Sequence, residues 1–118
     1  MTEYEEVLLL GWEDTYKKSQ LTLWLLLAIK DSPKKMAEIK EFIKDRTNDT
    51  ISADDKSMYR ALRRLAEADL IESTSVKSFA GPNSKLFELT EIGQNVLSRF
   101  VDRNIASVLL KKDNKDLF

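Results

Sequence analysis

The 118-residue sequence contains neither cysteine nor histidine, and both absences limit its chemistry. Without cysteine there is no disulfide framework, and without both residue types the usual zinc ligands are missing. The lack of histidine also removes the commonest acid–base residue of enzymes. Carboxylates and backbone oxygens remain as metal ligands, but no loop has the spacing of a calcium site. We therefore expect no metal site and no cofactor.

Two acidic pairs are the remaining candidates for catalysis. Asp54 and Asp55 are adequately explained by helix capping, and Asp113 and Asp116 by a charged, frayed tail. Neither pair is accompanied by a glycine-rich phosphate loop or by a residue that activates a nucleophile. The sequence therefore predicts no catalytic residues and no enzyme.

A long apolar run is also missing. The longest, Leu21 to Ile29 with Thr22 inside it, is far shorter than the roughly 20 residues of a membrane span. The chain begins with acidic residues rather than the basic region of a signal peptide. We expect a cytoplasmic protein without a membrane partner, folded as one domain over residues 1–118.

An excess of basic charge is absent as well. The 19 basic and 20 acidic residues give a net charge of −1, which weighs against tight nonspecific binding to nucleic acid. The local balance differs, because the stretch from Asp54 to Arg64 holds four basic and two acidic residues. Basic charge is thus concentrated in this segment, where it can contact a negatively charged partner.

That basic stretch is predicted to form a helix of about four turns, capped by Ser52 with Asp55 completing a capping box. Its apolar residues recur at helical spacing and form one stripe. They are Met58, Leu62, Leu65 and Ala66. We expect Tyr59 to face the core at the border of this stripe, and Arg63 to pair with Glu67 one turn on.

The cations lie opposite the apolar stripe. Arg60 and Arg64 are one turn apart, and Lys56 lies one turn before them. Arginine binds guanine edges bidentately or clamps phosphates, and Ser57 near the helix start can reach a base or a phosphate. The alternative is an ordinary solvated basic face.

A two-stranded hairpin is predicted next. Residues 71–76 and 86–89 alternate apolar and polar, and turn-forming residues lie between them. At its tip, Lys77, Asn83 and Lys85 can approach phosphates, although Glu72 and Glu88 bring the net charge of the hairpin to zero.

A basic helix followed by a hairpin is the arrangement of a winged helix-turn-helix. We predict a mainly α fold with a small β-hairpin wing, with the helix-turn-helix and wing in residues 20–89. Residues 20–30 form a largely buried helix. The next helix starts with Ser32 as cap and Pro33 as first residue, which makes Lys34 and Lys35 its best phosphate contacts.

The ends of the chain are predicted to make a dimer. Thr2 and Glu5 form a capping box at the start of residues 1–18, a helical segment interrupted or bent at Gly11 and Trp12. Thr90 caps a last helix over residues 90–111. This helix has two apolar stripes, of which one closes the core and the other needs a partner subunit. The first stripe is Ile92, Val96 and Phe100, and the one assigned to the homodimer interface is Leu97, Val101, Ile105 and Val108.

The two tryptophans allow a second interpretation. Trp12 and Trp24 are best explained by packing in the core or at the dimer interface. The alternative is an aromatic surface for a flat small-molecule effector between the subunits.

Three motifs resemble one known family. They are Met58 to Leu65 (MYRALRRL), Asp69 to Glu72 (DLIE) and Gly81 to Gly93 (GPNSKLFELTEIG). Together they are similar to the PadR-type transcriptional regulators in their short form, over about residues 20–110. The chain departs from the family pattern at Asp55-Lys56, where Pro-Gly is usual, at Asp69, where Gly is usual, and at Lys35-Met36-Ala37 in place of His-Gly-Tyr.

The resemblance implies a homodimeric, sequence-specific regulator of transcription that binds double-stranded DNA, with repression as the expected mode. The operator is expected to be palindromic, with half-sites about one helical turn apart. The acidic pI of about 5.6 keeps one alternative open, a winged-helix interaction module whose basic helix docks on an acidic protein.

Overall fold

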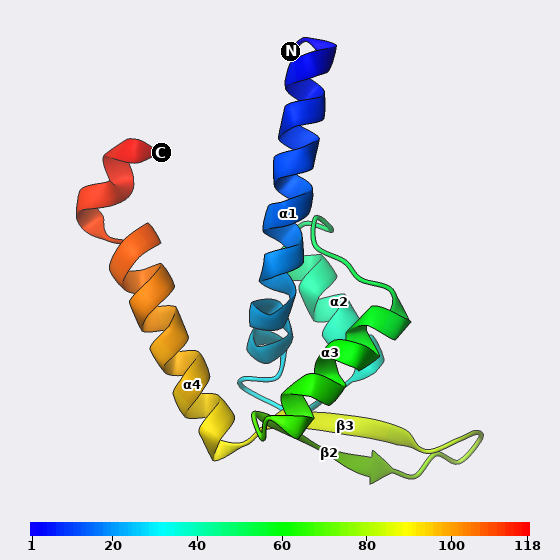
Figure 1. Ribbon diagram of the computed structural model, residues 1–118. Coiled ribbons are helices and arrows are strands. Elements are labelled where there is room, and N and C mark those ends of the chain that lie inside the picture. Colours follow the sequence, from blue (N-terminus) through cyan, green and yellow to red (C-terminus); the bar gives the residue numbers. More distant parts are fainter.

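The computed structural model describes residues 1–118 and confirms the predicted fold class, a mainly helical winged helix with a small antiparallel sheet (Figure 1). The helices are α1 (Glu3–Ala28), α2 (Met36–Arg46), α3 (Asp55–Glu67), α4 (Glu91–Val101), the π-helical η1 (Asp102–Leu109) and the 3-10 helix η2 (Lys112–Leu117). The strands are β1 (Lys34–Lys35), β2 (Ile71–Val76) and β3 (Ser84–Leu89). No helix combines the length and the apolar character that crossing a membrane requires.

The first helix is continuous, where the sequence predicted an interruption or bend at Gly11 and a separate second helix. A single glycine costs a helix only about 1 kcal/mol, and an ion pair across one turn between Lys17 and Glu13 (3.6 Å) supports the same stretch. The predicted capping box is present. Glu5 N–H donates to Thr2 Oγ1 (3.1 Å), and Thr2 N–H donates to Glu5 Oε1 (2.9 Å).

The start of α2 differs from the prediction. Ser32 does not cap it and Pro33 is not its first residue, because Lys34 and Lys35 are extended and pair with residues 86–87 of β3. The backbone of these two lysines gains sheet hydrogen bonds that a helix start would leave unmade. The wing therefore has a third strand, in the order β1-β3-β2, that the sequence did not indicate.

The hairpin itself follows the prediction closely. Strands β2 and β3 are antiparallel and pair over six positions, from Ile71 opposite Leu89 to Val76 opposite Ser84. Strand β3 begins two residues earlier than expected. The loop between the strands projects beyond the body of the molecule on the side opposite α4 (Figure 1).

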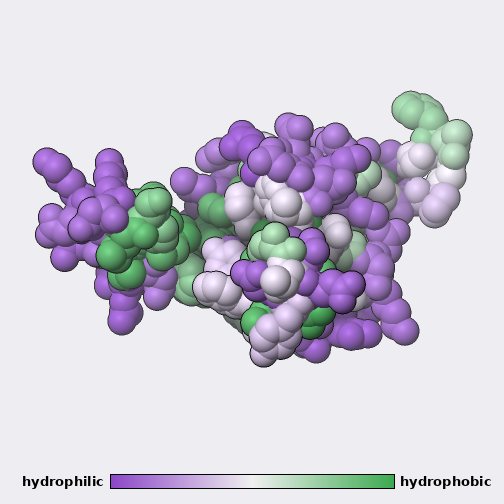
Figure 2. Space-filling model, turned by 90° about the horizontal axis from the view of Figure 1, so that it is seen from above, coloured by the Kyte–Doolittle hydropathy of each residue, from purple (hydrophilic) through white to green (hydrophobic).

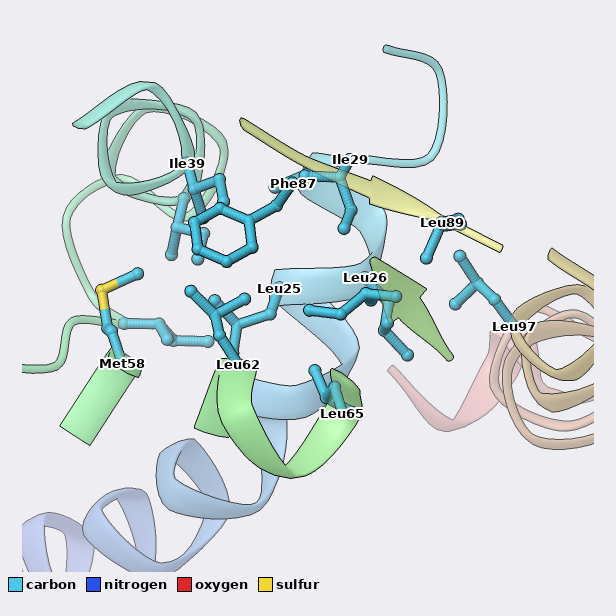
Figure 3. Close-up of a cluster of buried hydrophobic side chains, with 14 residues drawn as sticks. Leu25, Leu26, Ile29, Ile39, Met58, Leu62, Leu65, Phe87, Leu89 and Leu97 are labelled. Atoms are coloured by element: carbon cyan, nitrogen blue, oxygen red, sulfur yellow. The ribbon is translucent and has the colours of Figure 1, made fainter. Parts of the chain in front are cut away.

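One apolar core holds the elements together (Figure 3). Met58, Leu62 and Leu65 of α3 are buried, as predicted, and point toward side chains of α1, α2 and β3. Leu25 of α1 and Ile39 of α2 are fully buried in the same cluster. Because the apolar side of α3 is fixed in this core, its opposite side faces solvent.

The two apolar stripes of α4 exchange the roles that the sequence predicted. Leu97 is only 2% exposed and belongs to the core of its own protomer, so its assignment to a dimer interface is wrong. Ile92, Val96 and Phe100 are 54%, 47% and 48% exposed instead. Val101 packs partly against the core as well. The stripe that lacks a partner is the one expected to close the core.

The junction between α3 and α4 depends on a residue with left-handed backbone conformation. Asp69 has φ +61°, and its carbonyl accepts a hydrogen bond from Thr90 Oγ1 (2.5 Å). Thr90 also caps α4 as predicted, because Gly93 N–H donates to Thr90 Oγ1 (3.0 Å). Thr90 N–H donates to Leu70 O (3.1 Å). The chain thus turns from α3 into β2 against the first turn of α4.

Replacing Asp69 by glycine is expected to stabilise the protein by about 0.5–1 kcal/mol, because glycine adopts positive φ without the strain of a side chain. The gain is reduced by the greater freedom of glycine in the unfolded chain. Asp69→Ala is the matched control and should lower stability, since alanine tolerates this conformation less well than aspartate. Urea unfolding of the three proteins measures both effects, and equal midpoints would contradict the argument.

Candidate nucleic-acid interface

The exposed side of α3 carries a row of cations without ion-pair partners. Lys56, Arg60 and Arg64 are exposed, and none of them takes part in the four ion pairs of the chain. Arg63 is also exposed, and the predicted pair between Arg63 and Glu67 is not formed. Free guanidinium and ammonium groups on one helix side can bind phosphates or base edges. We call Lys56, Arg60 and Arg64 the cationic row.

Tyr59 is the residue that the sequence placed wrongly on this helix. It is 48% exposed rather than core-facing, because it lies about 100° from its buried neighbour Met58 around the helix axis. Tyr59 therefore belongs to the exposed part of α3 that also carries Lys56 and Arg60. The apolar stripe of α3 is too narrow to include Tyr59. The width of this stripe is the sequence feature from which the exposure of Tyr59 could have been predicted.

Two carboxylates fix the start of α3. Asp54 caps it, because Ser57 N–H donates to Asp54 Oδ1 (2.7 Å), so the predicted cap at Ser52 is wrong by two residues. Asp55 pairs with Lys40 of α2, with 2.5 Å between Nζ and Oδ1. This is the one ion pair that joins two helices, so it links α2 and α3 of the helix-turn-helix.

The pKa of Asp54 is lowered, first by the hydrogen bond from the Ser57 backbone and the Ser57 side chain, and then by the charges of Arg60 and Lys56. A folded-state pKa below the unfolded value of about 3.9 means that the ionised cap stabilises the fold above that value. This contribution is lost as the pH falls through the folded-state pKa.

We therefore expect Asp54→Ala to lower the thermal unfolding midpoint at pH 7, and to lower it less as the pH falls and the wild-type cap becomes protonated. Asp116→Ala, which removes an exposed carboxylate from η2 in the tail, is the control. Unfolding followed by circular dichroism at several pH values measures the difference. An effect that stays the same size as the pH is lowered would contradict the assigned role of the charge.

The lysines before α2 occupy different environments. Lys34 is half-buried, with Nζ 5.2 Å from the centre of the Phe42 ring and 3.2 Å from Ser32 Oγ. Arg46 also lies over Phe42, 4.9 Å from the ring centre, and was not predicted as a site residue. Lys35 is exposed. Two cations, one from β1 and one from the end of α2, therefore lie over the Phe42 ring.

The wing separates its charges along its length. Glu72 lies directly opposite Glu88 near the base of the hairpin. Lys85 is three residues nearer the tip than Glu88, or roughly 10 Å along the strand, and Lys77 follows the end of β2. Lys77, Asn83 and Lys85 are all exposed. The hairpin as a whole has a net charge of zero, but its tip is positively charged.

The start of α3 and the wing tip lie on one side of the molecule (Figure 1). The N-terminal end of α3 and the wing tip both point away from α4 and the C-terminus (Figure 1). Lys34 and Lys35 lie beside the wing, because their backbone pairs with strand β3. The arrangement offers a convex helix and a projecting hairpin to one elongated, negatively charged partner.

Comparisons with known proteins agree with this geometry. The model of the transcriptional regulator PadR-like family matches residues 25–99, more than half of the chain. Among curated proteins, none is similar enough to count as a match.

Three solved structures show the same fold. A PadR family transcriptional regulator from Eggerthella lenta DSM 2243 has a TM-score of 0.78 at 17% identity, with 98% of this chain and 97% of that chain covered. A PadR-like transcription factor from Bacteroides fragilis has a TM-score of 0.69 at 20% identity, covering 92% and 99%. Bacillus subtilis PadR in complex with operator DNA has a TM-score of 0.65 at 19% identity, covering 71% and 48%.

The family also confirms the expected class of protein, a regulator rather than an enzyme. The match over residues 25–99 shows that the chain belongs to the PadR-like family of transcriptional regulators.

Proposed function

We propose that this regulator binds double-stranded DNA in a sequence-specific manner through the cationic row of α3. The observation that carries the proposal is that Lys56, Arg60 and Arg64 are exposed and free of ion pairs, on a helix whose other side is buried. A helix of this kind fits the major groove, where arginine distinguishes guanine from other bases. The operator complex of Bacillus subtilis PadR, a protein of the same fold, supports DNA as the partner.

The other candidate residues position the protein on the duplex. Ser57, Lys34 and Lys35 lie at helix starts or beside them, and Lys77, Asn83 and Lys85 lie at the wing tip. Side chains of these types bind phosphate oxygens and set register without reading sequence. A protein held in this way at an operator blocks polymerase, so repression is the mode that we propose.

We further propose a homodimer, because the chain exposes more apolar surface than a monomer usually does. The α4 stripe of Ile92, Val96 and Phe100 is about half exposed. Large apolar residues of α1 are exposed as well: Tyr4, Val7, Leu8, Leu9, Leu10, Trp12 and Tyr16. Apolar atoms also gather on the limb formed by α4, η1 and η2, on the side that faces α1 (Figure 2). A second copy would cover these surfaces by two-fold symmetry.

The proposed interface keeps part of the sequence prediction. Val108 is 48% exposed and Ile105 is half-buried, so both remain available to a partner beyond the α4 stripe. Two α3 helices related by a two-fold axis would enter successive major grooves about 34 Å apart on one face of the duplex.

Selection of bound fragments from a pool of random 30-base-pair duplexes tests the proposal. We expect one palindromic sequence to emerge and two protomers to bind each duplex, with affinity that falls steeply as salt rises. Failure to enrich any sequence would contradict specific DNA binding. An acidic protein that co-purifies stoichiometrically, with no enriched duplex, would favour an interaction module instead.

The dimer has its own test. Phe100→Asp places a charge in the centre of the proposed interface and should give a monomer by light scattering, whereas Phe100→Leu should remain dimeric. A dimer in the aspartate variant would rule out this interface.

We also propose that a small-molecule effector binds beside the dimer interface. Leu9, Trp12 and Tyr16 of α1 line a hollow of about 410 Å³ together with Ile51, in the segment that leads to α3. A flat apolar molecule stacked on Trp12 would bias how α1 and α3 sit in the dimer. Trp24 is a poorer candidate because its indole N–H is buried. Quenching of Trp12 fluorescence by flat aromatic compounds, with Trp12→Leu as control, tests this.

A further inference from the structure

The wing tip carries a fully exposed phenylalanine. Phe79 is 111% exposed, more than any other large apolar residue of the chain. The remaining exposed apolar residues lie mainly on α1, α4 and the C-terminal helices, where the proposed dimer would cover them. Figure 2 shows apolar atoms at the far end of the wing, on the side opposite the C-terminal limb. A second copy bound along α1 and α4 would therefore leave Phe79 uncovered.

The chemistry around Phe79 selects an anionic partner. Lys77 lies two residues before it and Lys85 six residues after it, and residues 73–87 contain no acidic side chain. The two glutamates of the wing face each other at its base. The tip thus combines one aromatic ring with two cations, and a partner must offer both negative charge and an apolar surface.

The local backbone keeps this tip compact and projecting. Strands β2 and β3 pair up to Val76 and Ser84, so the loop that carries Phe79 begins immediately beyond a formed ladder. Gly81 has φ +152°, a conformation that favours glycine, and Pro82 follows it. The tip and the N-terminal end of α3 point to the same side of the molecule (Figure 1).

We propose that Phe79 enters the DNA minor groove beside the site of α3 and packs against sugars and base edges, while Lys77 and Lys85 hold the flanking phosphates. The inference rests on the proposed DNA binding. The minor groove has apolar sugar walls between two rows of phosphates, and apolar side chains inserted there unstack a base step and bend the duplex. Pyrimidine–purine steps yield most readily, so Phe79 would add preference at a position that α3 never touches.

The test uses the duplex that the full-length wild-type chain selects from the random 30-base-pair pool, labelled at both ends with a fluorescent donor and acceptor. Phe79→Ser should bind roughly tenfold more weakly, the loss expected when one apolar side chain no longer leaves water. The bend should decrease, while the dependence of affinity on salt should stay unchanged. Phe79→Leu should retain most of the affinity and bend.

A matched variant separates charge from insertion. Lys77→Ala should lower the slope of log affinity against log salt by about 1 and leave the bend in place. All variants should unfold at the wild-type temperature, because neither side chain makes a hydrogen bond or ion pair within the protein and Phe79 is fully exposed.

Wild-type affinity and bend in Phe79→Ser would overturn the inference and leave the proposed function intact. If the wild type selects no duplex at all, the proposed function fails first. Binding of the wild type, but not of Phe79→Ser, to vesicles of equal phosphatidylcholine and phosphatidylserine would then assign the tip to a membrane surface and overturn the inference as well.

Discussion

Replacing Arg60 and Arg64 together by glutamate is expected to weaken binding to the selected duplex by more than about 100-fold. Each arginine that contacts a base bidentately contributes about 1–3 kcal/mol, and two such losses alone correspond to at least about 30-fold. Two new negative charges facing the phosphates add repulsion. Fluorescence anisotropy with a labelled duplex at several salt concentrations measures the change.

The fold should survive this double substitution. Both arginines are exposed and make no ion pair, so their removal breaks no direct contact. Only the weak attraction between the Arg60 charge and the exposed Asp54 carboxylate is lost. Surface substitutions of this kind usually change stability by less than about 0.5 kcal/mol. The expected result is an intact dimer with a normal unfolding midpoint that no longer binds DNA.

A control with the same change in net charge makes the result specific to α3. Lys112→Glu with Lys115→Glu introduces the same charge change into η2, in the C-terminal limb away from α3 (Figure 1). We expect the duplex to bind this variant nearly as well as the wild type. Equal loss in both double variants would mean that net charge, rather than the cationic row, determines binding. Retained binding by the arginine variant would rule out α3 as the DNA-reading element.

The features of α3 that the sequence predicted correctly depend on local periodicity. Met58, Leu62 and Leu65 recur at helical spacing, and the structure buries all three. The exposure of Arg60 and Arg64 follows from the same geometry, because residues opposite a buried stripe must face outward. No knowledge of distant parts of the chain is needed for these features.

Features that depend on distant partners were not predictable in this way. Lys34 and Lys35 become a strand only because residues 86–87 of β3 lie beside them, about 50 positions further along the chain. The predicted cap of α3 was Ser52, whereas the structure has Asp54 as the cap. Serine and aspartate favour the N-cap position equally, so residue type alone does not decide between them. The tertiary structure decides between such alternatives, and the local sequence does not.

The prediction was wrong about which apolar stripe of α4 is buried in the core. The sequence offers two apolar stripes of similar quality, and contacts with the segment after α1 and with the turn before β2 select one of them. Gln94 Nε2 donates to Lys30 O (3.1 Å), and Gly93 lies directly against the backbone of Leu70. Leu97, one turn after Gly93, therefore enters the core. Phe100 is left facing outward.

Gly93→Ala is accordingly expected to be the most destabilising small substitution in the chain. A Cβ atom at this position would lie 1.9 Å from Leu70 O and 2.9 Å from Leu70 C, and neither backbone atom can move aside as a side chain does. It would also lie 3.3 Å from Leu89 Cδ2. Overpacking usually costs about 1–3 kcal/mol and more where the neighbours are rigid, so we expect a loss of about 3 kcal/mol or more.

Gly11→Ala is the matched control for this substitution. Gly11 is also helical, but nothing lies within 4 Å of a Cβ added there. Alanine has a higher helix propensity, so stability should rise by up to about 1 kcal/mol. Urea unfolding of the two variants and the wild type should therefore shift in opposite directions. Equal stability of Gly93→Ala and the wild type would show that α4 does not rest on Leu70.

The same substitution connects stability to DNA binding. Leu70 ends the turn that follows α3, and α4 carries the stripe proposed to join the two protomers. If Gly93→Ala displaces α4 without unfolding the chain, the two α3 helices change their separation and tilt in the dimer. Binding to a duplex with two half-sites should then weaken by more than tenfold, whereas binding to a duplex with one half-site should change little. An equal loss on both duplexes would instead indicate damage to α3 itself.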